Sequence, residues 1–245
     1  MRLPEPYYRT GEHIGIELAG ARAVFTTRRG GFSDGPYRSL NLGRWTDDDS
    51  ATVERNRALL GEQLGVRFAY CRQVHGTSVI GVDAPSEPGS SPRQADGQAT
   101  TTAGIGLAAL TADCLPVAVA GTEAVAMLHA GWRGLADGVI GEGVRAVRAL
   151  AGSGSLIAAI GPGAGPCCYE VGDEVRAEFA RHGQAAFRGQ NLDLKTIARL
   201  ELERAGVDCI HDVGLCTICS PRSLFYSHRR DRGITGRQAG VAWLS

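Results

Sequence analysis

The sequence has no excess of charge of either sign. Its 245 residues carry 26 Lys and Arg against 26 Asp and Glu, a formal net charge of +0 at pH 7. Such a chain has no long-range positive field that would concentrate nucleic acid or anionic lipid at its surface. We therefore expect neither nucleic acid nor a membrane among its partners, and any recognition of charge must be local.

The sequence also lacks a secretory signal and a membrane span. Residues 1–18 contain early prolines and acidic residues where a signal needs an apolar run. The apolar stretch 103–131 is interrupted too often by polar residues and proline to offer ~20 lipid-facing positions. Seven cysteines, an odd number in a chain without a signal, indicate reduced thiols rather than a disulfide scaffold. We therefore expect a cytoplasmic protein.

No internal repeat or heptad run is present, and the one low-complexity stretch, residues 83–97, is too short and too central for a domain linker. The length suffices for one large core. The 34 glycines exceed the usual share of about 7% and predict many tight turns. We expect residues 1–245 to form a single domain and, without a long amphipathic seam, a monomer.

Short apolar runs predict strands, several of them continuous as in a sheet covered on both faces. The predicted strands are residues 21–31, ending in a glycine turn, 68–74, 79–82, 106–110, 115–120, 124–129, 155–162 and 240–244. Helices are predicted at 51–65, along the stripe of Ile140, Val144 and Val147, and at 192–206 with Asp193 as N-cap. The expected fold is α/β, with a mixed central sheet flanked by helices.

Three residues that could bind a metal lie at or near predicted strand ends, where α/β sheets gather functional side chains. These are His75, Cys114 and His129. One thiolate and two imidazoles suit Zn²⁺ with an open fourth position, and copper also favours such ligands. However, a lone Cys in an apolar strand is most often a core residue, and the spacings match no short zinc pattern.

Several blocks in fixed order carry a resemblance to a known family. RQVHG, ADG, TADCLPV, LHAGWRG, GPCCYEVG, LFYSHRRD and GITGRQAG follow one another along the chain. From about Arg22 to the C-terminus the sequence resembles the YfiH (FAMIN) family, also known as multicopper polyphenol oxidases or laccases. The resemblance implies a single α/β domain with a metal at His75, Cys114 and His129. It also implies phosphorolysis of purine nucleosides (adenosine, inosine, methylthioadenosine), with adenosine deamination as a second activity.

The residues agree in part with both implied reactions. Zinc lowers the pKa of a water that it binds to about 7, which suits deamination. The sequence lacks the H-x-E and P-C-x-x-C pair of zinc deaminases, so another group must move the proton. Asp113 is the catalytic candidate, and Glu170 or Asp173 are alternatives.

Phosphorolysis requires a bound polyanion, which guanidinium groups and backbone N–H groups can hold. Candidate substrate-binding residues are Arg28, Asn41, Arg229 and Arg230, with Arg133 as a weaker one. Each arginine has an ordinary solvated interpretation, and an Asx turn explains Asn41 equally well. Two positions depart from the family pattern: His228 replaces a tyrosine and Gln238 replaces a methionine.

The remaining cysteines give a weak signal. Cys216 and Cys219 form a C-x-x-C which, with Cys209, could hold a second metal or act as a redox pair, but no second pair at zinc spacing accompanies it. Cys167 and Cys168 are adjacent and are not expected to share a site.

Two other functions remain open. Cys114 could be a nucleophile with His129 as base, giving a hydrolase of an amide or ester such as a cell-wall precursor. Alternatively, the chain could be a copper- or zinc-binding protein whose polyphenol oxidase activity is adventitious. The resemblance favours the nucleoside phosphorylase. The arginine- and glycine-rich blocks would have no purpose in a protein that only binds a metal.

Overall fold

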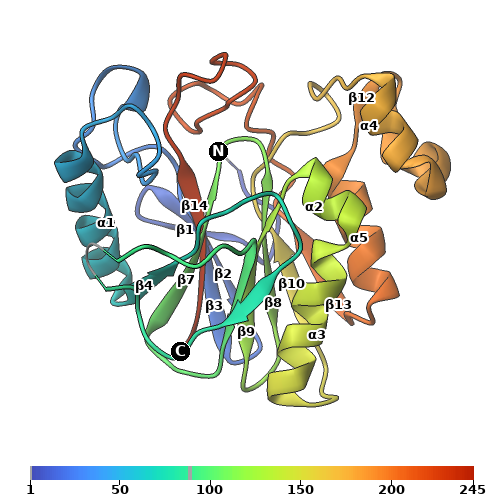
Figure 1. The fold of residues 1–245 in the computed structure, drawn as a ribbon, viewed down its shortest axis with the longest axis horizontal. Coiled ribbons are helices and arrows are strands. Elements are labelled where there is room, and N and C mark those ends of the chain that lie inside the picture. Colours follow the sequence, from blue (N-terminus) through green and yellow to red (C-terminus); the bar gives the residue numbers. More distant parts are fainter. Residues whose placement is uncertain (1, 88–89) are drawn as a thin grey trace.

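The computed structural model describes residues 2–87 and 90–245, and it has four layers: helix, sheet, sheet and helices (Figure 1). The first sheet has the order β1-β2-β3-β14-β7-β4. Its strands are β1 (Tyr8–Thr10), β2 (His13–Leu18), β3 (Ala21–Phe25), β4 (Arg67–Tyr70), β7 (Ile105–Thr111) and β14 (Gln238–Leu244). In this sheet β4 runs parallel to β7 and the other pairs are antiparallel.

The second sheet has the order β13-β10-β8-β9-β6-β5 and is also mixed. Its strands are β5 (Val79–Gly81), β6 (Gly97–Thr100), β8 (Leu115–Ala120), β9 (Val125–Ala130), β10 (Ile157–Ile160) and β13 (Cys209–Asp212). The two outer pairs, β10 with β13 and β5 with β6, are parallel. A small ribbon of β11 (Phe187–Arg188) and β12 (Asn191–Leu192) lies outside both sheets.

Helix α1 (Ser50–Leu64) covers the outer face of the first sheet, while α2 (Trp132–Asp137), α3 (Val139–Ala151) and α5 (Leu194–Arg204) lie on the side of the second (Figure 1). A short α4 (Asp173–Glu178) and two 3-10 turns, Gly35–Tyr37 and Ala180–Ala186, complete the helical elements of the described ranges. None of the described helices has the length and apolar character that a membrane crossing requires.

Three apolar cores separate the layers. The middle core lies between the two sheets and includes Phe25, Leu107 and Met127. At Gly240 the sheets approach so closely that a Cβ would lie 2.5 Å from Pro116. The other two cores pack the second sheet against α3 and α5, and the first sheet against α1. Burial of every residue of β7, β8 and β9 follows from cover on both faces.

The α/β class predicted from the sequence is confirmed, with the strands divided between two mixed sheets rather than gathered in one. The strand predicted at 115–120 matches β8, and the predicted cap is confirmed because the Asp193 side chain accepts a hydrogen bond from the Thr196 N–H. The strand predicted at 68–74 ends at Tyr70. Part of the loop predicted at 83–97, residues 88–89, lies outside the described residues.

Six strands were missed, namely β1, β2, β6, β11, β12 and β13. Strand β6, with the sequence GQAT, is entirely buried but has no apolar pattern. Its Gln98 amide nitrogen donates to the carbonyl groups of Ala69 and Ala108, whereas its Oε1 atom is buried without a hydrogen-bond partner among the described residues. Burial of a hydrogen-bonded polar group leaves no signal in hydrophobic periodicity.

Candidate functional site

The candidate residues lie at one edge of the two packed sheets. Strand register places the start of β14 beside Thr111 at the end of β7, and the start of β8 beside Ala130 at the end of β9. The start of β6 pairs with Leu128, near the same end of β9. Segments that follow or precede these strands, which are far apart in the sequence, therefore meet at this edge.

The structure brings together the three residues that were predicted as metal ligands. The ligand atoms of His75, Cys114 and His129 all lie within 4.8 Å of one another. The Cys114 sulfur is 3.9 Å from the His75 Nε2 atom, and the two imidazole rings meet edge to face with centroids 4.9 Å apart. His129 is buried, Cys114 is half-buried and His75 is exposed, so the cluster opens toward solvent on one side.

Unusual backbone conformations orient the segments that carry His75 and Cys114 toward the cluster. His75 has a φ of 61° and Asp113, directly before Cys114, has a φ of 91°, both in the left-handed region that non-glycine residues rarely adopt. Gly131 leaves room for the cluster, because a Cβ there would lie 2.9 Å from the His75 ring and 3.0 Å from the Cys114 sulfur.

Asp96 holds the cluster in position, although it was not among the residues predicted from the sequence. Its buried carboxylate accepts hydrogen bonds from the backbone N–H groups of Val74, His75 and Gly76 at 2.8 to 3.1 Å. The same carboxylate lies 2.8 Å from the His129 Nδ1 atom. This pairing leaves the His129 Nε2 atom as the one available for a ligand. The only sequence signal for Asp96 was its place in the ADG block.

The charges at the cluster shift two pKa values in opposite directions. Burial alone would raise the pKa of Cys114, but the charge and hydrogen bonds of His129 and His75 lower it to about 6. Burial disfavours the charged form of His129, but Cys114 and Asp96 raise its pKa to about 9. The cluster thus favours a thiolate beside an imidazolium.

The donor set fits a divalent metal ion. Zn–S and Zn–N bonds of about 2.3 and 2.0–2.1 Å place tetrahedral ligand atoms ~3.3–3.6 Å apart. Here the Cys114 sulfur lies 3.9 Å from the His75 Nε2 atom, and all three ligand atoms lie within 4.8 Å of one another. The Asp96 contact to a ligating imidazole is also typical of metal sites. Three protein ligands leave one position open. His75, Cys114 and His129 could therefore hold such an ion.

Asp113, the predicted acid or base, is occupied by structural contacts. It accepts hydrogen bonds from the Thr217 hydroxyl at 2.6 Å, the Ser227 hydroxyl at 3.1 Å and the Arg229 backbone N–H at 2.7 Å. Both carboxylate oxygens thus tie the loop that carries Arg229 to the loop that carries Cys114. A catalytic role for Asp113 stays a prediction, and this geometry favours a positioning role.

A cavity of about 460 Å³ opens onto the cluster, a volume within the usual range for small-molecule sites. Its lining includes Arg133, Arg229 and Arg237 together with His228, as well as His75, Cys114 and His129. The Arg133 guanidinium lies 4.2 Å from the centre of the Trp132 ring, and the Arg229 guanidinium 5.1 Å from that of Tyr169. A larger cavity of about 940 Å³ beside α1 contains none of the three ligand candidates.

Three predicted substrate-binding residues do not line this cavity. Arg28 donates to the carbonyl groups of Arg38, Arg222 and Pro36. The Arg230 side chain donates to two backbone carbonyls and pairs with Asp231.

The third is Asn41, which is fully buried. Its amide donates to Thr46 and Asp48 and accepts from the backbone of Gly43 and Arg237. These contacts shape loops around the cavity rather than its surface, and substrate binding by Arg28, Asn41 and Arg230 stays a prediction.

Arg237 was missed, although it lies in the GITGRQAG block. It precedes β14 at the site edge, and both hydrogen bonds of its guanidinium run from Nη1 to the carbonyls of Thr235 and Gly236. The neighbouring Gln238 is buried and pairs through both amide atoms with the Tyr226 backbone. Of the two departures from the family pattern, only His228 reaches the cavity.

Comparisons with known proteins agree with this architecture. Residues 22–245 match the family described as multi-copper polyphenol oxidoreductase laccase. A Pseudomonas aeruginosa relative named purine nucleoside phosphorylase is 41% identical, covering 92% of this chain and 94% of its own. Escherichia coli YfiH, also named purine nucleoside phosphorylase, is 39% identical over 92% of this chain and 94% of its own.

Solved structures show the same fold. The crystal structure of YlmD from Geobacillus stearothermophilus matches with a TM-score of 0.90 and 35% identity, covering 98% of this chain and 99% of that one. Bacillus licheniformis YfiH matches with a TM-score of 0.89 and 31% identity, covering 99% and 100%. The resemblance seen in the sequence blocks is therefore confirmed, and the chain belongs to the YfiH family of multi-copper polyphenol oxidoreductase laccases.

Proposed function

We propose that this protein is a metal-dependent purine nucleoside phosphorylase. The observation that carries the proposal is the shared cavity, in which the His75, Cys114 and His129 cluster faces the same space as three guanidinium groups. Relatives about 40% identical over most of the chain are named for this activity. We further propose that residues 1–245 act as one catalytic domain, as a monomer in the cytoplasm, where the seven free cysteines stay reduced.

In the proposed reaction an oxygen of inorganic phosphate forms a bond to C1 of the ribose while the glycosidic C–N bond breaks. The base nitrogen keeps the bonding electrons and takes up a proton. The products are a free purine and ribose 1-phosphate, and no oxidant is needed. The protein's task is to hold the anion in line with the breaking bond and to stabilise the leaving base.

Arg133, Arg229 and Arg237 would bind the phosphate. Guanidinium groups bind phosphate oxygens through paired N–H donors. Only the Nη1 atom of Arg229 is committed to the Glu170 carbonyl, and only the Nη1 atom of Arg237 is committed to the two carbonyls of its own turn. Both side chains therefore retain donors that can face a ligand in the cavity.

His75, Cys114 and His129 would hold the metal, with Zn²⁺ as the expected ion and copper as the alternative. When bound, such an ion would act as a Lewis acid that polarises an oxygen or nitrogen of the substrate. Asp96 would fix the His129 tautomer, and the Asp113 carboxylate would fix the loop that bears Arg229. Trp132 and Tyr169 would limit access of water and orient the two arginines.

We propose adenosine, inosine and methylthioadenosine as substrates and adenosine deamination as an accompanying hydrolysis. To test this, the purified protein is incubated with each nucleoside with and without phosphate, and the products are separated by chromatography. Adenine that forms only with phosphate supports the phosphorylase, and inosine formed from adenosine supports the deaminase. Turnover of no purine would contradict the proposal and favour a metal-binding protein with adventitious oxidase activity.

A second candidate is supported by one observation. Cys114, His129 and Asp96 form a chain resembling a nucleophile, a base and an orienting carboxylate, and the pKa of Cys114 is lowered to about 6. This arrangement fits a thiol hydrolase of an amide or ester. Iodoacetamide labelling of Cys114 that is fast and insensitive to zinc or chelator would favour the hydrolase, and protection by zinc would favour the metal site.

A further inference from the structure

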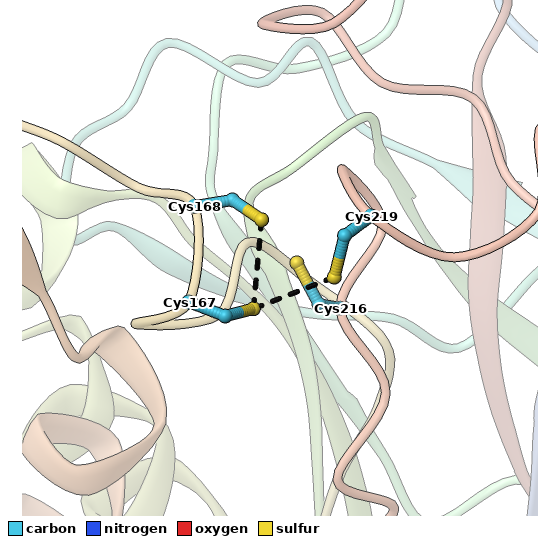
Figure 2. Close-up of side chains that lie close together, drawn as sticks. All are labelled: Cys167, Cys168, Cys216 and Cys219. Atoms are coloured by element: carbon cyan, nitrogen blue, oxygen red, sulfur yellow. Dashed lines mark hydrogen bonds between the residues drawn. The ribbon is translucent and has the colours of Figure 1, made fainter.

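A second cluster of potential ligands lies in two loops outside the cluster described above. Cys167 and Cys168 belong to the segment after β10, and Cys216 and Cys219 to the segment after β13 (Figure 2). Because β10 and β13 are parallel neighbours, both segments leave the sheet at the same edge. Backbone hydrogen bonds between Gly163 and both Leu215 and Thr217 hold the two segments together.

The four sulfur atoms converge on one point. The Cys167 sulfur lies 3.5 Å from that of Cys219 and 3.6 Å from that of Cys168, and all four lie within 4.8 Å of one another. A Zn–S bond of about 2.3 Å places the sulfurs of a tetrahedral four-cysteine site ~3.8 Å apart. The expectation that the adjacent Cys167 and Cys168 cannot share a site was wrong, because both sulfurs turn to the same side (Figure 2).

The predicted third partner of the C-x-x-C lies elsewhere. The Cys209 sulfur is 3.3 Å from the His211 Nε2 atom on β13 and is not part of the cluster. Sequence spacing could not identify Cys167 and Cys168 as partners of Cys216 and Cys219, because the parallel pairing of β10 and β13 alone brings them together.

The backbone is arranged to stabilise a thiolate at Cys216. The Gly165 N–H donates to the Cys216 sulfur at 3.2 Å. Thiolate is the form that binds metals. Cys167 and Cys219 are exposed, so an ion can reach the cluster.

We propose that Cys167, Cys168, Cys216 and Cys219 bind one Zn²⁺ ion in a tetrahedral, structural site separate from the cluster of His75, Cys114 and His129. Each ligating thiol releases its proton and donates a sulfur lone pair, with no oxidation or reduction. Four cysteine ligands leave no open position, so the ion carries no reaction itself.

The site would brace one wall of the cavity. Thr217 lies within the C-x-x-C and donates its hydroxyl hydrogen to Asp113, the residue before Cys114. Tyr169 follows Cys168 directly and lines the cavity beneath Arg229. An ion at the four cysteines would therefore hold both the Asp113 contact and the Tyr169 ring in place.

The first test uses the unmodified protein and residue-resolved alkylation. Reduced, metal-free protein is treated with iodoacetamide with and without one added equivalent of Zn²⁺ beyond that needed to protect Cys114, and each cysteine is followed by mass spectrometry. We expect zinc to slow labelling of the four clustered cysteines by at least ~10-fold, with Cys209 unchanged. Equal labelling with and without zinc, or a disulfide within the cluster after purification with zinc present, would overturn the proposal.

The second test compares zinc content. The double variant Cys216→Ser/Cys219→Ser is expected to bind one zinc ion per chain fewer than the matched control Cys209→Ser. This difference is independent of whether the His75 cluster binds metal, so the two proposals fail separately. Equal zinc content in the folded double variant and the control would refute the four-cysteine site.

Discussion

Replacing Asp96 by asparagine tests how the His75, Cys114 and His129 cluster is assembled. One carboxylate oxygen accepts from His75 N–H and contacts His129 Nδ1, and the other accepts from the N–H groups of Val74 and Gly76. Asparagine has one acceptor oxygen and one NH₂ group. In either orientation of the side chain, its NH₂ group faces one or more backbone N–H donors that hydrogen-bond to the carboxylate in the unsubstituted protein.

The consequence for His129 depends on which amide atom faces it. An NH₂ group at that position would need His129 Nδ1 as an acceptor, which places the ring proton on Nε2 and blocks the atom available for a metal. The other orientation keeps the tautomer but leaves the N–H groups of Val74 and Gly76 without their acceptor. We expect Asp96→Asn to weaken zinc binding about 10–100-fold and to lower the free energy of unfolding by about 1–3 kcal/mol.

Zinc affinity is measured by competition with a chromophoric chelator, and stability by denaturant unfolding of the metal-free protein. Asp208→Asn is the matched control, because Asp208 also accepts from a backbone N–H and a hydroxyl, those of Leu156 and Ser155, but away from the cavity. The control should keep its zinc affinity. A folded Asp96→Asn protein with unchanged zinc affinity would refute the reasoning about the tautomer.

Three further outcomes are expected. Cys114→Ser should lower the rate of phosphorolysis at least ~100-fold, since a catalytic metal stabilises the transition state by several kcal/mol. The rate is measured as phosphate-dependent release of the base, and full activity would contradict a role for the cluster. Arg229→Lys or Arg237→Lys should raise KM for phosphate about 10-fold through loss of paired donors, whereas Arg28→Lys should leave that KM unchanged. Steady-state kinetics with phosphate varied measures KM, and a raised KM in Arg28→Lys alone would contradict this assignment. Burial raises the pKa of Asp231, but contacts with Arg230 outweigh it and lower the pKa. The contribution of Asp231 to stability is therefore present above about pH 4 and is lost as the pH falls further. Asp231→Asn should reduce the loss of unfolding free energy at acid pH, and an unchanged loss would count against the ion pair.

The sequence predicted the parts of the fold that rest on apolar patterns. Strands β7, β8 and β9 are continuous apolar runs because they lie between two packed layers, and periodicity identifies such runs well. Strand β6 was missed because its buried Gln98 places a polar side chain in the core, where its amide nitrogen donates two hydrogen bonds. The division of the strands into two sheets depends on pairing between distant segments, which local patterns do not encode.

Sequence patterns likewise predicted only part of the candidate site. The blocks around His75, Cys114 and His129 are distinctive in their residue types and were predicted together. Asp96 escaped notice because a single aspartate before a glycine resembles an ordinary turn residue. Arg28 was predicted and Arg237 was not, although both lie near glycine in the sequence. Only the packed loops determine which of the two side chains lines the cavity.

The proposed reaction requires that phosphate, not water, attacks the ribose in this cavity. The most direct measurement converts inosine with unlabelled phosphate in water enriched in oxygen-18 and analyses the sugar product by mass spectrometry. We predict ribose 1-phosphate without label, because its new C–O bond comes from phosphate. Free ribose carrying the heavy isotope, formed at the same rate without phosphate, would contradict the claim.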